Sequence, residues 1–90
     1  MNNQQRKNLK SLFNDLGKAI DLISGIRSDI EDIKYEEEDK FDNLPDGLKY
    51  ARVGEDIESG ISSLDEILTQ LEYAYDNLED ASNQIEELAE

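Results

Sequence analysis

The chain has 90 residues, no cysteine and no histidine, and it carries a formal net charge of −14. This length predicts one domain over residues 1–90, and a chain of this size has difficulty burying enough surface in one core. The lack of cysteine excludes a disulfide framework and favours a reducing compartment. No apolar run reaches the roughly 18–20 residues of a membrane span, and the basic start lacks the apolar core of a signal peptide. We therefore expect a cytoplasmic protein that does not enter membranes.

The charge is distributed unevenly along the chain. Residues 53–90 hold twelve acids and no basic residue, whereas residues 1–52 hold all nine Lys and Arg residues against eleven acids. Because nucleic-acid phosphates would be repelled by this charge, direct nucleic-acid binding is disfavoured. A basic protein partner, or a protein with a nucleic-acid-binding groove, is compatible with it.

The first predicted element is a helix over about residues 6–40. Its apolar residues recur in steps of three and four, which is the pattern of a coiled-coil seam rather than of a strand. The expected seam residues are Leu9, Leu12, Leu16, Ala19, Ile23, Ile26, Ile30 and Ile33.

A corner follows over about residues 41–53 and contains the only proline of the chain. Pro45, Asp46 and Gly47 suit the last three positions of a type I turn. Alternatively, Asn43 caps a short helix that starts at Leu44. The sequence leaves these two conformations open. In either one, four apolar residues are expected to close this end of the seam: Phe41, Leu44, Leu48 and Tyr50.

The second long helix is predicted over about residues 54–89. Its expected seam residues are Ile57, Ile61, Leu64, Leu68, Leu71, Tyr75, Leu78, Ser82, Ile85 and Ala89. If the chain reverses at Gly47, position i faces position 94 − i, and small Ala19 lies opposite bulky Tyr75. The fold class is therefore all-α, an antiparallel two-helix coiled-coil hairpin. This arrangement also brings the basic start of the first helix beside the acidic end of the second.

Apolar residues flank both seams, so the apolar stripe is wider than a lone hairpin requires. They are Phe13, Ile20 and Leu22 on the first helix and Ile67, Ala74, Ala81 and Leu88 on the second. We expect self-association, with two hairpins forming a homodimeric four-helix bundle. The competing interpretation is that this surface docks on another protein.

Neither catalysis nor metal binding is predicted. Without histidine or cysteine the chain lacks the usual general base at neutral pH and the strongest nucleophile, so we expect no enzyme. A calcium-loop frame that starts at Asp42 places Leu44 and Val53 where oxygen ligands are required, and it therefore fails. No cofactor is expected.

The acidic surface is the main functional signal. Residues 28–66 hold fourteen acids against four basic residues, a net charge of −10, and a focused negative field steers a basic partner. The alternative interpretation is that the acidic residues serve only to keep the protein soluble. The two outward tyrosines are further candidates for a partner contact. The candidate partner-binding residues are Glu36, Glu37, Glu38, Asp39, Asp42, Asp46, Glu55, Asp56, Glu58, Tyr35 and Tyr73.

The stretch Phe41-Asp-Asn-Leu-Pro-Asp-Gly-Leu48, followed by Gly54-Glu-Asp-Ile-Glu58 and Asn77-Leu-Glu-Asp-Ala81, resembles small acidic hairpin proteins encoded by phages and prophages of Gram-positive bacteria. The resemblance implies an origin in a mobile element and residence in the host cytoplasm. It further implies binding to a host protein, which the chain inhibits or sequesters, for example against host defence. The acidic surface suggests, as one form of such binding, mimicry of nucleic acid. The alternative function is a structural, self-assembling helical-bundle module.

Overall fold

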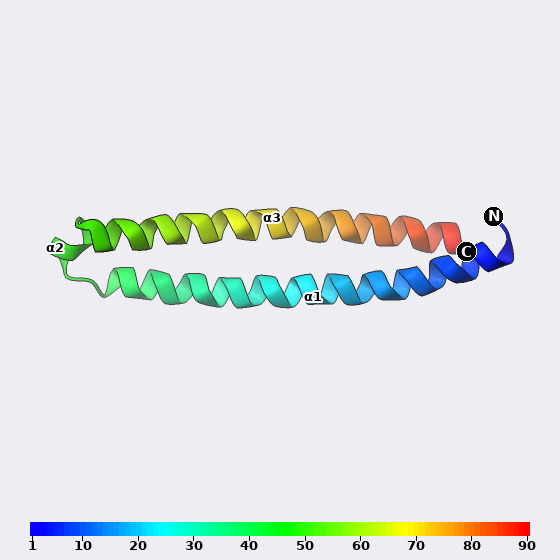
Figure 1. Ribbon diagram of the computed structural model, residues 1–90, viewed down its shortest axis with the longest axis horizontal. Coiled ribbons are helices and arrows are strands. Elements are labelled where there is room, and N and C mark those ends of the chain that lie inside the picture. Colours follow the sequence, from blue (N-terminus) through cyan, green and yellow to red (C-terminus); the bar gives the residue numbers. More distant parts are fainter.

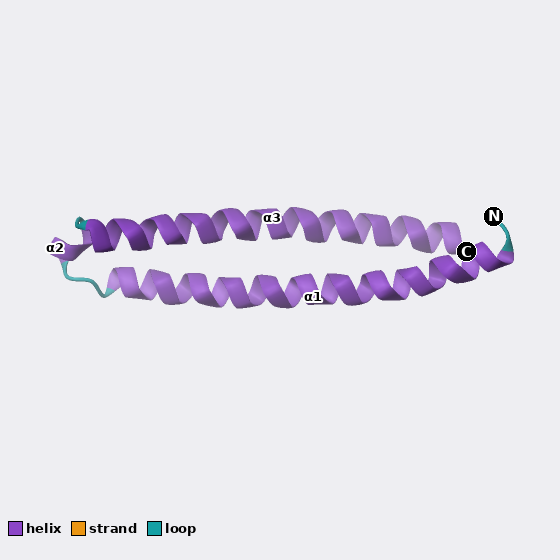
Figure 2. Cartoon of the chain, in the orientation of Figure 1, coloured by secondary structure: helices purple, strands orange, loops and turns teal.

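The computed structural model describes residues 1–90 and consists of three helices without strands: α1 (Asn3–Asp42), α2 (Asp46–Lys49) and α3 (Arg52–Ala89). The long helices α1 and α3 run antiparallel side by side, and α2 lies at the corner that joins them (Figure 1). Helix accounts for nearly the whole chain (Figure 2). The molecule is a rod of 68 × 15 × 13 Å. The prediction of an all-α helical hairpin is confirmed.

None of the helices combines the length and the apolar character needed to cross a membrane.

A capping box fixes the start of α1. The Gln5 backbone N–H donates to the Asn2 side chain at 2.8 Å, and the Asn2 backbone N–H donates to the Gln5 side chain at 3.1 Å. These two bonds satisfy backbone donors that have no partner within the helix. As a result α1 begins at Asn3, earlier than the predicted residue 6, and it extends to Asp42 rather than residue 40.

The seam of α3 is as predicted, but half of the predicted seam of α1 is wrong. All ten expected seam residues of α3 are buried or partly buried. On α1, Leu12, Ala19, Ile26 and Ile33 are exposed. The residues that face α3 are instead Leu9, Phe13, Leu16, Ile20, Ile23, Arg27, Ile30, Lys34, Glu37 and Phe41.

The register differs correspondingly from the expected one. The ion pair between Lys34 and Asp65, together with the two rows of inward residues, places the partner of position i near 98 − i rather than 94 − i. Ile20 therefore lies level with Leu78, and the expected pairing of Ala19 with Tyr75 is wrong. The cause is the corner, because α2 lengthens the connection and moves the reversal point beyond Gly47.

At the corner, α2 is a single separate turn of helix that begins after Pro45, so neither alternative from the sequence is adopted as stated. The backbone N–H groups of Leu48 and Lys49 donate to the Pro45 carbonyl at 2.8 and 3.1 Å. Asn43 is the C-cap of α1 and does not cap a following helix.

Two of the four apolar corner residues close the seam as expected. Phe41 and Leu44 are partly buried, and the Lys49 ammonium lies 5.7 Å from the centre of the Phe41 ring, within the range of a cation–π contact. Leu48 and Tyr50 are exposed instead, at 45% and 86%, so their predicted role is wrong. Gly54 is buried under the corner, where the Leu48 and Lys49 carbonyls leave no room for a Cβ atom.

The termini meet at the opposite end of the rod. The first turns of α1 project beyond the end of α3, which follows from the shifted register (Figure 1). Arg6, Lys7, Lys10 and Glu90 line one shallow groove there, so the basic start and the acidic end do lie together. No ion pair within 4.0 Å joins them.

Candidate functional site

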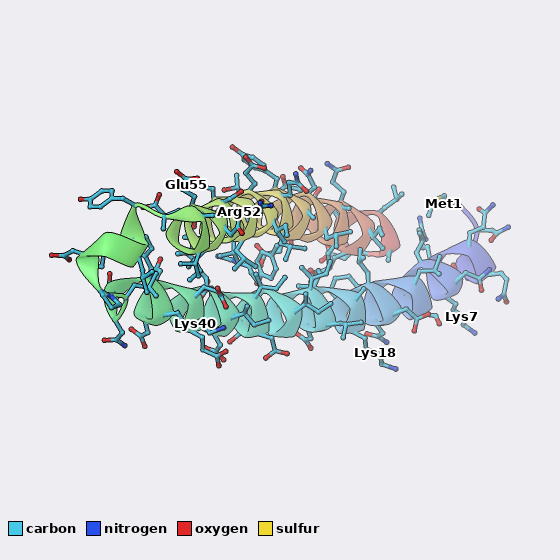
Figure 3. The ribbon with its side chains drawn as sticks, turned by 60° about the vertical axis from the view of Figure 1, so that its left-hand side comes forward. Met1, Lys7, Lys18, Lys40, Arg52 and Glu55 are labelled. Carbon is cyan, nitrogen blue, oxygen red and sulfur yellow. The ribbon has the colours of Figure 1, made fainter.

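Ten of the eleven candidate residues gather at the corner end. Tyr35, Glu36, Glu37, Glu38, Asp39 and Asp42 occupy the end of α1, Asp46 opens α2, and Glu55, Asp56 and Glu58 lie in the first turns of α3. Figure 3 shows Lys40, Arg52 and Glu55 at this end, whereas Met1, Lys7 and Lys18 lie toward the other. We call residues 28–66 the corner half.

Every basic residue of the corner half is neutralised by a neighbouring acid. Local pairs join Lys40 Nζ to Glu37 Oε1 at 2.7 Å, Arg52 Nε to Asp56 Oδ2 at 3.9 Å and Lys49 Nζ to Asp46 Oδ1 at 4.0 Å. The hydrogen bond from Lys40 to Glu37, aided by the charge of that carboxylate, raises the pKa of Lys40.

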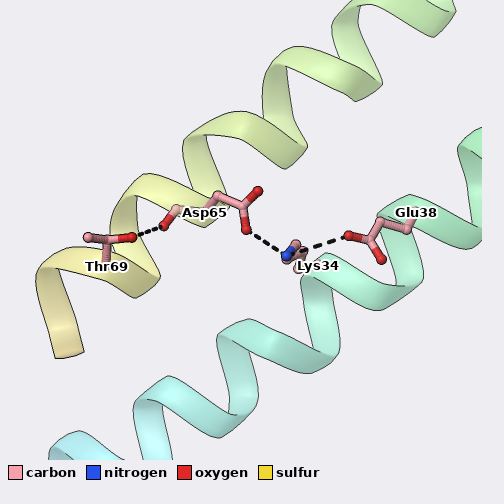
Figure 4. Close-up of polar contacts among 4 residues, drawn as sticks. All are labelled: Lys34, Glu38, Asp65 and Thr69. Atoms are coloured by element: carbon pink, nitrogen blue, oxygen red, sulfur yellow. Dashed lines mark hydrogen bonds and ion pairs between the residues drawn. The ribbon is translucent and has the colours of Figure 1, made fainter.

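Lys34 makes the one ion pair that links the two long helices. Its Nζ lies 2.6 Å from Asp65 Oδ1 on α3 and 3.6 Å from Glu38 Oε1 on α1 (Figure 4). The Thr69 hydroxyl donates to the Asp65 backbone carbonyl at 3.1 Å in the same view. The hydrogen bond to Asp65 raises the pKa of Lys34 above its usual value of 10.5. The pair therefore marks the register of the two helices, because it joins a residue of α1 to a residue of α3.

Nine of the fourteen acids in the corner half have no basic partner within 4.0 Å. Eight of these nine are exposed, and Glu31 is partly buried. The unpaired acids are Asp29, Glu31, Asp32, Glu36, Asp39, Asp42, Glu55, Glu58 and Glu66. The four basic residues of this half are engaged locally, so they leave the field of these carboxylates uncompensated.

The tyrosine candidates separate in space. Tyr35 is exposed at the corner half, but Tyr73 is exposed near the middle of α3 and does not join the acidic group. Tyr50 was missed as a surface residue, although it is 86% exposed at the corner beside the acids. The sequence held no clear signal for this exposure, because Tyr50 directly follows a four-residue helix that was not predicted.

The acidic side chains do not form a metal site, and the hollows on the surface are open. No group of three acidic side chains converges closely enough to hold a metal ion. The hollows on the surface are shallow grooves along the helices, one of them lined by Ser24, Arg27, Ser28 and Glu31. A hydrogen bond to the Glu79 carboxylate, together with its negative charge, raises the pKa of Tyr75.

The two long sides of the hairpin differ in character. The seam between α1 and α3 is bordered by two flanks, one on each side of it. In an antiparallel pair each flank is formed by one row of residues from α1 and one row from α3. The polar flank carries Lys10, Gly17, Ser24, Glu31 and Glu38 of α1 and Glu58, Asp65, Glu72, Glu79 and Glu86 of α3. The apolar flank carries Leu12, Ala19, Leu22, Ile26 and Ile33 of α1 and Gly60, Ile67, Ala74, Ala81 and Leu88 of α3.

Comparison of the chain with models of protein families, with curated proteins and with solved structures gives no match.

Proposed function

We propose that this chain is a non-enzymatic acidic binding protein whose corner half occupies a basic surface on another protein. The observation that carries the proposal is the set of nine unpaired carboxylates around one end of the rod. Such a concentrated negative field speeds encounter with a basic partner and disfavours an acidic one. The rigid α1 and α3 hold these groups at fixed spacing.

The proposal extends to the class of partner. The resemblance of the Phe41–Leu48 corner to phage and prophage hairpins supports a host protein as the target, bound in the host cytoplasm and thereby inhibited or sequestered. A groove that normally binds nucleic acid has the required basic character, and an anti-defence role fits such a target. Tyr35 and Tyr50 supply exposed aromatic contacts beside the acids, and aromatic residues are enriched in interface cores.

The test compares two variants of equal charge. One neutralises five corner acids (Glu36→Gln, Asp39→Asn, Asp42→Asn, Glu55→Gln, Glu58→Gln). The control neutralises five exposed acids elsewhere on α3 and at its end (Glu72→Gln, Asp76→Asn, Asp80→Asn, Glu87→Gln, Glu90→Gln). Each immobilised chain is used to capture host proteins at low and high salt, and the bound proteins are identified by mass spectrometry.

We expect the wild-type chain and the control to capture the same basic protein at low salt, and the corner variant to lose it. High salt should release the protein from both binding chains. Competition by duplex DNA for the captured protein would support nucleic-acid mimicry. Equal capture by the two variants would contradict a role for the corner. If no basic protein is captured even at low salt, the alternative stands, which is a structural self-assembling module whose acidity serves solubility.

A further inference from the structure

The hairpin leaves much more surface exposed than a compact protein of its size. Its accessible surface is 6603 Å², against about 5,400 Å² expected for a compact monomer of 10.3 kDa. Only Gly54, Ser82 and Ala89 are buried, and no large side chain is fully enclosed. The excess includes the apolar flank, where the six Leu and Ile side chains are each between 40% and 66% exposed.

Three properties of the apolar flank fit it to a second copy of the same chain. First, all ten of its residues are uncharged, so two chains of net charge −14 can meet there without opposing carboxylates. Second, it extends over both long helices, so it can cover two helices of a partner. Third, the flank of α3 has the small residues Ala74 and Ala81 between the large residues Ile67 and Leu88, which leaves room for the large residues of a facing α1.

The area also matches what a stable dimer needs. The flank spans about 32 Å from Leu12 to Ile33, at roughly 1.5 Å per residue. Across two adjacent helices this gives on the order of 600 Å² per copy, close to the lower end of the 600–1,000 Å² per partner in stable interfaces. Leu22, the most exposed apolar residue of the flank at 66%, lies near its middle, where the small residues of a facing copy leave room for it.

We propose that two copies pack through their apolar flanks into a four-helix bundle, with α1 of each copy on α3 of the other and both corners at the same end. A two-fold axis parallel to the helices relates the copies, so the interface is isologous. This inference names the surface of self-association and does not depend on the proposed acidic binding function.

The rim of the apolar flank determines the orientation. On α1 the rim carries Asp15, Asp29 and Glu36, whereas the rim of α3 carries uncharged polar residues: Ser63, Gln70, Asn77 and Gln84. With both corners at one end, each rim acid of α1 lies level with an amide or hydroxyl of the second copy. The reverse orientation would place Asp15 level with Asp29 of the second copy, a direct repulsion between carboxylates. The corner halves also repel each other, but salt screens charges separated by more than about 8 Å.

The dimer has a consequence for the acidic surface. It places two corner halves at one end and doubles the net charge of −10 there. In a single chain, residues 53–90 hold twelve acids over 38 residues, about one charge per 5 Å, against one per about 1.7 Å in duplex DNA. Two adjoining corners therefore resemble nucleic acid more closely than one.

Sedimentation equilibrium over a concentration series, in physiological salt, tests the interface. Leu22→Glu places a carboxylate on the apolar flank, and Ser28→Glu places one on an exposed position on another side of α1. We expect a wild-type dimer, a dissociation constant raised at least about tenfold by Leu22→Glu, and no change with Ser28→Glu. Circular dichroism checks that both variants remain helical. A wild-type chain that stays monomeric throughout the series, or equal dimerisation of the two variants, would overturn the interface.

Crosslinking tests the orientation, because the chain has no cysteine of its own. Leu22→Cys and Asn77→Cys are made as separate single-cysteine chains and treated with a short bis-maleimide, alone and mixed. With both corners at one end, Leu22 lies level with Asn77 of the second copy, so only the mixture should yield a crosslinked dimer. Crosslinking of each variant with itself, and not in the mixed pair, would overturn this orientation.

Discussion

Lys34 shows why the sequence pattern misplaced half of the α1 seam. The pattern selected apolar residues, but Lys34 and Arg27 occupy seam positions and are partly buried. A long basic side chain can cover apolar surface with its aliphatic stem while its charged end reaches a polar edge. The edge of α3 next to Lys34 carries Asp65, at 2.6 Å. Both residues are visible in the sequence, but only the structure shows that they pair across the helices. This pairing allows a charged lysine to occupy a seam position.

The Lys34–Asp65 pair predicts a dependence of stability on alkaline pH. The pKa of Lys34 is raised above 10.5 in the folded chain, chiefly by the hydrogen bond to Asp65. The pair therefore stabilises the hairpin fully below pH 10.5, and this contribution is lost as pH rises through the folded pKa. Asp65→Asn should lower the melting temperature at pH 7 by a small amount, since exposed pairs contribute little.

Thermal melts followed by circular dichroism at pH 7 and at alkaline pH provide the measurement. The difference in melting temperature between wild type and Asp65→Asn should shrink as Lys34 loses its proton. A difference that stays constant or grows with pH would show that Asp65 acts in another way. Subtraction between the two chains removes the contribution of Tyr75, whose raised pKa also favours the folded state at lower pH.

At the scale of the elements, the sequence predicted the two long helices and their antiparallel course. The sequence pattern predicted the α3 seam correctly and half of the α1 seam wrongly, because the two helices differ in how many rows of apolar residues they carry. On α3 the large apolar residues follow one row, with Ile67 and Leu88 as the only large apolar residues on the flank. On α1, Leu12 competes with Phe13 and Ala19 competes with Ile20, so two rows fit the period equally well. Only packing against α3 chooses between them.

The corner was less predictable, because a tertiary contact determines it. Pro45 and Gly47 indicated a reversal, but they gave no sign of the close approach of α2 to Gly54. The same applies to the candidate site. Its acids could be found from sequence, whereas the local pairing of all four basic residues of the corner half required the structure.

Gly54 and Gly25 predict opposite effects of the same substitution. Gly54→Ala brings a Cβ atom against the Leu48 and Lys49 carbonyls, so we expect a loss of roughly 1–3 kcal/mol in the free energy of unfolding. Gly25 lies within α1, and the space that a Cβ atom would occupy there is open, so Gly25→Ala should stabilise by about 1 kcal/mol. Urea denaturation measures both. Equal effects of the two substitutions would contradict the packing at the corner.

At the scale of the whole molecule, repulsion between negative charges destabilises the folded hairpin, and only a small buried core counteracts it. The net charge of −14 is spread over a rod with only three buried residues. Salt reduces the range of this repulsion, with a Debye length of about 30 Å at 0.01 M and about 3 Å at 1 M. The hairpin should therefore gain stability with added sodium chloride.

We expect the melting temperature to rise by several degrees between these two salt concentrations. The variant with five neutral corner residues should show a smaller rise, because it has less repulsion to screen. Circular dichroism melts of both chains provide the comparison. A melting temperature that falls with salt would mean that attractive ion pairs outweigh the repulsion.

The central claim is the register near 98 − i, because it places Leu12, Ile26 and Ile33 outside the seam and so creates the apolar flank. Paired cysteines within one chain test it most directly, by disulfide formation in dilute solution with non-reducing gel mobility as the readout. We predict that Ile20→Cys with Leu78→Cys forms an intramolecular disulfide and that Ala19→Cys with Tyr75→Cys does not. The reverse result would restore the 94 − i register and contradict the packing described above.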